Sequence, residues 1–307
     1  MATVTAPTTP KAWSPTQHHI VAQTRSAGKA SRAALLGLLQ RDLIVLKKNF
    51  GEFVTRTLVQ PFLLTFVFLY VFPTIGQGIG GGRGAAGEST FATILVPGVV
   101  GIAVMFQGIQ AVAMPLAQEF GFTREIEDRV QAPCPVWLVA MSKVLSASVQ
   151  GVLAAAIVFP IASVVHAHGV HAHLTFHWLT LVTLLPPACV AFSGLGLYLG
   201  TKFEPRNLGL MFGFIVLPIT FLGGTYYAWT ALSPVKVGGF HWLQTLVLIN
   251  PLIYVNEGMR AALTNTSIYA DPHHAHMHLY VVYPVLLGFS ALFLWLGIRG
   301  FRRRVLS

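Results

Sequence analysis

The amino-acid sequence predicts an all-α, polytopic membrane protein with six transmembrane helices, an interfacial amphipathic helix before the first, and a re-entrant outer hairpin between the fifth and sixth. Of its 307 residues, 54% are apolar and only 10% are charged, whereas a soluble domain carries about 25% charged residues. Six segments contain the roughly 20 mostly apolar residues that a helix needs to cross a bilayer. These segments are residues 53–72, 91–117, 136–165, 176–200, 208–227 and 279–298.

The hairpin is predicted from residues 221–263, which are too apolar for an ordinary loop and too often interrupted by Gly, Pro and charge for one span. Irregular backbone is tolerated at membrane depth only where protein or water satisfies its polar groups, because lipid offers no hydrogen-bond partner. A half-inserted hairpin on the outer side is the simplest arrangement that meets this condition.

The first 30 residues are rich in Thr, Pro, Ala and Ser and lack the continuous apolar core of a signal peptide. They predict a disordered cytoplasmic tail, followed by a single transmembrane domain over residues 31–307. Within residues 31–49, Leu35, Leu39, Leu43 and Leu46 recur near helical spacing. This pattern favours an amphipathic helix at the membrane surface, and the alternative is a simple extension of the first span.

Lysine and arginine indicate the orientation, because they accumulate in short cytoplasmic connections. With the N-terminus inside, all of them except Arg83, Lys236 and Arg260 lie on the inner side. The sequence therefore predicts a multi-pass protein of the cytoplasmic membrane with both termini in the cytoplasm. The net charge of +10 suits the membrane surface better than nucleic acid, since the charges separate long apolar runs.

The most charged inner connection lies between the second and third predicted spans, at residues 117–137. Thr123 can cap a short helix, in which Phe122, Ile126 and Val130 recur at four-residue spacing. Two prolines that follow prevent this helix from continuing. The connection is either a docking point for a soluble partner or a solvated connector.

Common catalytic motifs are missing from the sequence, among them the G-x-x-x-x-G-K-[ST] phosphate loop, H-E-x-x-H and G-x-S-x-G. We therefore expect that the chain is not an enzyme. No acidic residue lies deep in a predicted span, which argues against a proton relay. An active transporter of this kind must take its energy from another protein.

The sequence resembles the membrane subunits of type 2 ABC exporters, particularly the daunorubicin-resistance and nodulation-type permeases. Three features carry the resemblance: the six-span plan with its leading amphipathic helix, the acidic inner loop that runs through Ala132, Pro133 and Pro135 to Lys143, and the outer segment. In the outer segment, FLGGTYYAWTALSP is followed by LINPLIYVNEGMR. These features extend from about residue 31 to residue 304.

The resemblance implies that the inner loop docks into an ATPase subunit and that the outer segment forms re-entrant helices that close the export path. It also implies that ATP and Mg²⁺ bind to the partner ATPase and not to this chain, and that the permease pairs with a second copy or a homologous permease. The coupling residues would be Glu119, Phe122, Glu125, Ile126, Asp128 and Arg129. The external gate would comprise Gly223, Gly224, Asn250, Pro251, Glu257 and Arg260.

Elementary chemistry agrees with this assignment of the outer segment. Paired glycines permit a sharp turn or close backbone approach. Pro251 suits the first turn of a helix that Asn250 can cap. Glu257 and Arg260, at three-residue spacing, can neutralise each other at the interface. Ordinary loop turns are the alternative.

Polar residues within the second and third spans should avoid lipid and face other helices or a cavity. They either line a substrate path or hydrogen-bond between helices, and the candidates are Gln107, Gln110, Ser146 and Gln150. Outer histidines suggest a weak metal site, a pH-sensitive surface or an incidental composition. The candidates are His166, His168, His171, His173, His273, His274, His276 and His278. Neither cluster has a nearby Cys or a well-placed carboxylate beyond Asp271, so we expect no metal centre.

Together these observations predict the permease subunit of an ATP-driven ABC exporter that moves a hydrophobic or amphipathic substrate, such as a drug, lipid or glycolipid, out across the cytoplasmic membrane. The alternative is an ion-coupled secondary transporter or metal exporter that uses the outer histidines; a membrane enzyme is a third class. The sequence does not identify the substrate, the ATPase, or the choice between homodimer and heterodimer.

Overall fold

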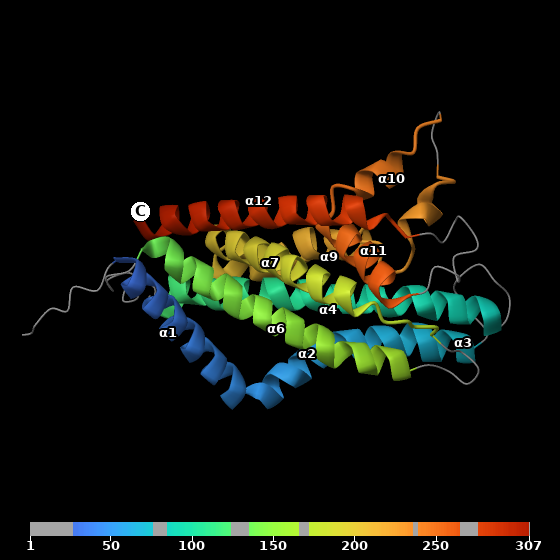
Figure 1. The fold of residues 1–307 in the computed structure, drawn as a ribbon, viewed down its shortest axis with the longest axis horizontal. Coiled ribbons are helices and arrows are strands. Elements are labelled where there is room, and N and C mark those ends of the chain that lie inside the picture. The colour runs from blue at the N-terminus through green and yellow to red at the C-terminus, as the bar shows by residue number, and fades with distance from the viewer. Residues whose placement is uncertain are drawn as a thin grey trace, which may run out of the picture.

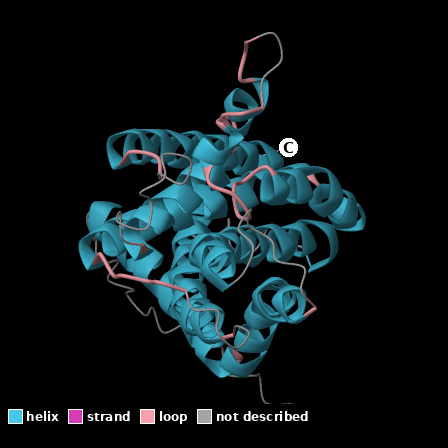
Figure 2. Ribbon diagram, turned by 90° about the vertical axis from the view of Figure 1, so that its right-hand side faces the viewer, coloured by secondary structure: helices cyan, strands magenta, loops and turns pink. Residues whose placement is uncertain are grey.

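The computed structural model describes residues 27–75, 85–123, 135–165, 172–235, 239–264 and 276–306. Over these residues the chain is almost entirely helical (Figure 2). Instead of a strand, this part of the chain contains an isolated antiparallel bridge between Leu174 and Thr264. The prediction of an all-α protein is confirmed.

The first half of the chain forms three long helices and the oblique helix that precedes them (Figure 1). Its elements are α1 (Ala27–Lys48), α2 (Phe50–Thr65), η1 (Phe66–Val71), α3 (Phe72–Thr74), α4 (Ala85–Gln118), η2 (Glu119–Thr123) and α6 (Val136–Val164). The second half contains α7 (Trp178–Lys202), η3 (Pro205–Asn207), α8 (Leu208–Met211), η4 (Phe212–Val216), α9 (Leu217–Phe221), η5 (Trp229–Leu232), α10 (Trp242–Val247), α11 (Pro251–Leu263) and α12 (Leu279–Leu306).

Five helices of the described chain are long and apolar enough to cross a membrane. They are Phe50–Thr74, Gly87–Gly121, Val136–Ile161, Trp178–Lys202 and Leu279–Val305. They correspond to the first four predicted spans and the last. Each contains at least one proline yet continues through it.

The predicted fifth span, residues 208–227, is shorter than expected. Its apolar helix covers Pro205–Phe221, and the chain then turns at residues 222–224. Gly224 has a φ angle of 68°, a left-handed conformation that ends helices and that glycine adopts without steric cost. The predicted end at Tyr227 is therefore wrong.

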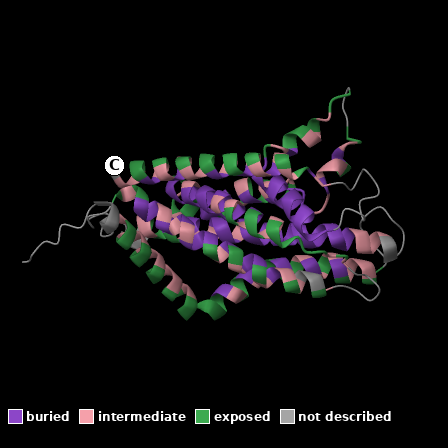
Figure 3. Cartoon of the chain, viewed as in Figure 1, coloured by how far each residue is buried: buried purple, intermediate pink, exposed green. Residues whose placement is uncertain are grey.

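The long helix α4 lies at the centre of the bundle, where it packs against α2, α6, α7 and α11. Within α4, 83% of the apolar stretch is buried, whereas only 22% is buried in the first and last membrane-length helices. The apolar side chains of α4 extend from all sides of the helix, so other helices can pack around its whole surface. The exposed residues follow the outer surfaces of the bundle (Figure 3). These outer surfaces are apolar enough to face lipid.

The start of α1 and the end of α12 lie at the same end of the bundle, while α10 lies at the other end (Figure 1). Helix α1 begins at Ala27, inside the predicted tail, and residues 1–26 of that tail lie outside the described residues. In α1, Leu35, Leu39 and Leu43 are half-buried, and Arg41 and Lys48 are exposed. Leu36, Ile44 and Val45 are exposed as well, so the interfacial position of α1 stays a prediction.

Candidate functional site

The segment predicted to lie outside divides into a buried part, which includes α11, and an exposed part around α10, which projects from the bundle (Figure 1). Every residue of α11 is buried, and α11 packs against α4, α7 and α12. The irregular backbone before it, from Leu222 to Ala228, is therefore surrounded by protein groups that can accept or donate hydrogen bonds. This is the condition under which non-helical backbone is stable at membrane depth.

Asn250 fixes the start of α11. Its side-chain Oδ1 accepts a hydrogen bond from the backbone N–H of Leu252 at 2.9 Å, and Pro251 occupies the first helical position. Its Nδ2 donates to the carbonyl of Ile219 at 2.7 Å, which ties α11 to α9. The predicted cap is confirmed, and the same amide joins the two arms of the hairpin.

Glu257 and Arg260 form an ion pair with no solvent exposure, and Nη1 of Arg260 lies 2.8 Å from Oε1 of Glu257. Oε1 also accepts from the backbone N–H of Trp229 at 2.8 Å, and Oε2 accepts from that of Met277 at 2.9 Å. The predicted mutual neutralisation is confirmed. Both side chains are enclosed by protein, and their position at the membrane interface stays a prediction.

The guanidinium group of Arg260 connects the hairpin to α4. Its Nη2 donates to the carbonyls of Gly224 and, at 3.3 Å, Thr225, and its Nε donates to the carbonyl of Ile94 in α4 at 3.4 Å. A buried ion pair is tolerated only when such additional hydrogen bonds compensate for lost hydration. We call Asn256, Glu257, Arg260 and the carbonyls of residues 223–225 the hairpin network.

Asn256 is a member of this network that the sequence analysis did not identify. Its Nδ2 donates to the carbonyl of Gly223 at 2.7 Å and contacts Oγ1 of Thr225 at 3.1 Å. Its Oδ1 faces Gly101 of α4, where an added Cβ would lie only 1.9 Å away. In the sequence, the available signal for Asn256 was a polar residue next to Glu257 in an otherwise apolar run. Its partner Gly101 lies 155 positions earlier, so the contact itself was not predictable from neighbouring residues.

The predicted glycine turn is also confirmed. Gly223 and Gly224 are both buried, and a Cβ on Gly224 would lie 2.1 Å from Cδ1 of Ile253. The turn therefore needs glycine both for its positive φ angle and for the close approach of α11. Asn250, Pro251, Glu257, Arg260 and the two glycines thus lie within one buried unit.

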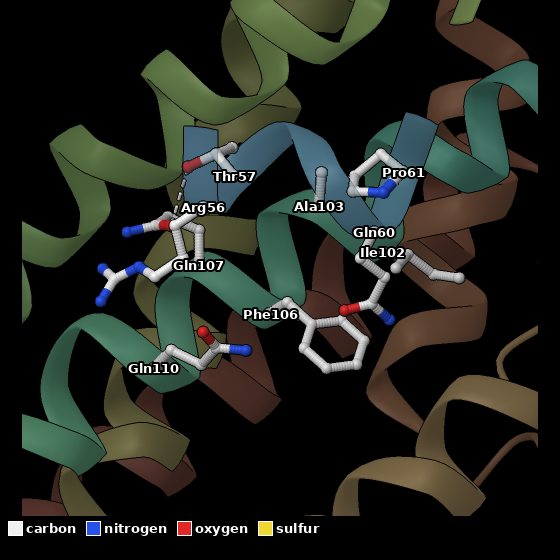
Figure 4. A pocket seen from close by; sticks show the side chains of 9 residues that line it. All are labelled: Arg56, Thr57, Gln60, Pro61, Ile102, Ala103, Phe106, Gln107 and Gln110. Carbon is white, nitrogen blue, oxygen red and sulfur yellow. Dashed lines mark hydrogen bonds between the residues drawn. The ribbon is translucent and has the colours of Figure 1, made fainter. Parts of the chain in front are cut away.

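Polar residues of three helices form a hydrogen-bonded chain toward the other end of the bundle. Gln107 of α4 donates through Nε2 to Oε1 of Gln150 in α6 at 3.0 Å, and it accepts from the hydroxyl of Thr57 in α2 at 3.3 Å. Figure 4 shows Gln107 and Gln110 beside the pocket between α2 and α4, which has a volume of only about 30 Å³. For Gln107 and Gln150, hydrogen bonding between helices is confirmed.

A larger cavity of about 640 Å³ opens between α1, α2, α4 and α6, and we call it the inner cavity. Ser146 and Gln150 line it together with apolar side chains such as Leu46, Phe53 and Pro115. Its charged lining is balanced, with three basic and three acidic residues: Arg41, Arg56, Lys143, Asp42, Glu52 and Glu119. Of the predicted path residues, Ser146 and Gln150 reach this cavity, whereas Gln107 and Gln110 line the small pocket.

Glu119, the first predicted coupling residue, forms an ion pair with Lys143 of α6. Both side chains are largely shielded, with 12% and 10% exposure respectively. Phe122 belongs to η2, but its side chain is outside the described part. The other predicted coupling residues, Glu125, Ile126, Asp128 and Arg129, lie outside the described residues.

The described histidines do not assemble a metal site. No group of three or more His, Cys, Asp or Glu residues suited to a metal ion occurs in the described part of the chain. His173 and His278 are exposed, and His276 is half-buried. The remaining candidates, His166, His168, His171, His273 and His274, lie outside the described residues.

Five apolar helices of membrane-spanning length, the buried helix α11 and the inner cavity define a multi-pass membrane protein of the transporter class. The family model described as ABC-2 type transporter matches residues 33–264, well over half of the chain. The protein belongs to this family and is a transmembrane permease of an ABC transporter.

Curated relatives agree with this assignment. The chain is 27% identical over 208 residues to the inner membrane transport permease YadH of Escherichia coli K12, an alignment that covers 67% of this chain and 74% of the relative. The same identity and coverage are found for the YadH proteins of Escherichia coli O157:H7 and Shigella flexneri.

Proposed function

We propose that this permease exports a hydrophobic or amphipathic molecule, such as a drug, lipid or glycolipid, out across the cytoplasmic membrane. The inner cavity is the observation that supports this substrate class. Its volume of about 640 Å³ lies within the range of small-molecule sites. Apolar walls and a balanced set of charges lie side by side in it, so it can receive both parts of an amphipathic molecule.

The energy source in this proposal is a pair of partner ATPase subunits, which bind ATP and Mg²⁺. The permease side of the contact is the inner loop after α4, with Glu119, Phe122, Glu125, Ile126, Asp128 and Arg129. The ion pair between Glu119 and Lys143 joins the base of this loop to α6. A displacement of the loop by the ATPase can therefore be transmitted to the wall of the inner cavity, which contains both residues.

The hairpin network forms the outer gate in this proposal, with both termini cytoplasmic and a second permease copy or homologue opposite. Glu257 and Arg260 would act as positioning residues, because their hydrogen bonds join α11, η5, the glycine turn and α4. Such a network favours movement of the hairpin as one body. Binding of ATP would shift the equilibrium between two arrangements through the differential affinity of the docked ATPase for each.

The coupling part is tested with the triple variant Glu125→Ala, Asp128→Ala and Arg129→Ala. The wild-type permease, reconstituted in liposomes with its ATPase, should stimulate ATP hydrolysis, and the triple variant should abolish this stimulation while it inserts normally. The control variant replaces three exposed charged residues of α1 with alanine: Arg32, Lys47 and Lys48. Unchanged stimulation in the loop variant would contradict the docking assignment.

The substrate part is tested separately with Ser146→Phe, which introduces an aromatic ring into the inner cavity. We expect transport of a fluorescent amphiphile to fall while the permease still copurifies with the ATPase. Thr183→Phe in α7 is the control, since Thr183 is exposed and does not line the cavity. Equal transport by both variants would show that substrate does not pass through the inner cavity.

A further inference from the structure

A second hollow, of about 500 Å³, lies between the ends of α7 and α12. We call it the basic hollow, because every charged residue that lines it within the described chain is basic. Its polar lining consists of Tyr198, Thr201, Lys202, Arg299, Arg303 and Arg304. The inner cavity, by contrast, contains equal numbers of acidic and basic residues.

Three of these four cations have no acidic partner in the part of the chain that the structure describes. Among the described residues, no ion pair involves Lys202, Arg299 or Arg303. Arg304 differs, because its Nη1 donates to the carbonyl of Thr201 at 2.7 Å and thereby satisfies the end of α7. The unpaired cations repel one another across the hollow, and an anion placed between them would relieve this repulsion.

Aromatic rings lie beside three of the four cations, and the guanidinium of Arg304 lies 4.7 Å from the ring centre of Phe120. The ammonium group of Lys202 lies 5.9 Å from the ring centre of Tyr198, and the guanidinium of Arg299 lies 5.2 Å from that of Trp295. Tyrosine and tryptophan are enriched at the boundary between membrane and water. The two membrane-length helices end nearby, at Lys202 and Val305. We therefore expect the basic hollow to lie at head-group depth.

The helix ends alone do not account for this arrangement. A helix C-terminus favours a nearby cation, and cytoplasmic connections favour lysine and arginine in general. Either effect would place single cations on solvated surfaces. Neither requires cations from two helices to line one hollow between them, with acidic residues such as the neighbouring Glu204 outside it.

We propose that the basic hollow binds the phosphate-bearing head group of an acidic phospholipid from the membrane leaflet at this end of the bundle. Basic pockets between transmembrane helices are suited to such head groups, and arginine forms bidentate hydrogen bonds with phosphate oxygens. The bound lipid bridges α7 and α12, so it stabilises their contact at the end that is predicted to be cytoplasmic. This site is separate from the inner cavity and does not depend on the substrate.

The test measures lipid retention by native mass spectrometry on the full-length permease, released from nanodiscs of phosphatidylcholine with a minor fraction of phosphatidylglycerol. The hollow variant carries Lys202→Gln, Arg299→Gln and Arg303→Gln. The control variant carries Arg32→Gln, Arg206→Gln and Arg302→Gln, which removes the same charge from exposed residues outside the hollow. Wild type and control should retain phosphatidylglycerol. The hollow variant should bind it more weakly by on the order of a hundredfold, because each basic residue near an anionic head group contributes about a fivefold effect.

Three outcomes would overturn the proposal. Equal losses in the hollow and control variants would show diffuse surface attraction without a site. Displacement of the lipid by excess inorganic phosphate, with phosphate retained in its place, would show a site for a free anion. Unchanged lipid retention together with lost copurification of the ATPase would show a protein contact. If the triple variant does not fold, the exposed single substitution Arg303→Glu gives the same comparison against Arg302→Glu.

Discussion

The buried ion pair of the hairpin network provides the sharpest test of the structure. Arg260→Met removes the guanidinium but keeps most of the side-chain volume. The carbonyls of Ile94, Gly224 and Thr225 then lose their donor, and Glu257 loses its cation while it stays buried. Removal of one partner from a buried pair costs about 3–5 kcal/mol. We expect the melting temperature to fall by roughly 6–10 °C, at about 2 °C per kcal/mol for a chain of this size.

Thermal unfolding of the purified permease in detergent measures this effect, with Arg206→Met as the exposed control that should change stability by less than about 0.5 kcal/mol. Glu257→Gln should also destabilise, because its amide nitrogen would face either the N–H of Met277 or the donors on its other side. The double variant should be less destabilised than the sum of the single effects, since the two residues share one network. Additive effects, or a melting temperature of Arg260→Met equal to that of wild type, would refute the assignment of a buried, coupled pair.

Two further predictions concern contacts between helices. Gly101→Ala should destabilise the protein by about 1–3 kcal/mol in the same unfolding assay, because the added Cβ would displace Asn256 from its hydrogen bonds. Gly51→Ala is the control, because a Cβ at Gly51 meets open space. This control should be neutral or should stabilise the protein by up to about 1 kcal/mol. If Gly101→Ala left the stability unchanged, the close approach of α4 and α11 at Gly101 would be contradicted. Gln107→Leu should destabilise by about 0.6–2 kcal/mol, the range for hydrogen bonds between membrane helices, and a cycle with Gln150→Leu should reveal coupling. Independent effects of the two leucine substitutions would show that this hydrogen bond contributes nothing.

The long apolar helices were predictable from sequence because their signal is local. Hydropathy over about 20 residues is enough to locate a membrane-length helix, and five of the six predicted segments are such helices. The Asn250 cap and the glycine turn were also predictable, because each depends on neighbours within a few positions. The end of the fifth predicted segment was missed because Tyr226 and Tyr227 were counted as apolar residues of the span, whereas the left-handed Gly224 already changes the direction of the chain.

The partners of the polar residues were not predictable, because they come from distant parts of the chain. Arg260 binds the carbonyl of Ile94, and Asn256 requires the absence of a side chain at Gly101. Spacing placed Glu257 and Arg260 together but did not indicate that both are buried, since three-residue spacing carries no information about burial. Likewise, the polar character of Gln107 and Gln150 indicated that they avoid lipid, and only the packing of α4 against α6 showed that they bond to each other.

The sequence by itself determined the helical membrane class, the positions of the apolar helices, the resemblance to ABC-2 permeases and the turn chemistry of the outer segment, since all of these depend on local composition and spacing. The tertiary structure decided where the charges lie. It enclosed Glu257 and Arg260 in the hairpin network, gathered balanced charges around the inner cavity and placed four basic residues around the basic hollow. The energy of a charge depends on its partners and on its access to water, and both are set by helices that meet only in the folded chain.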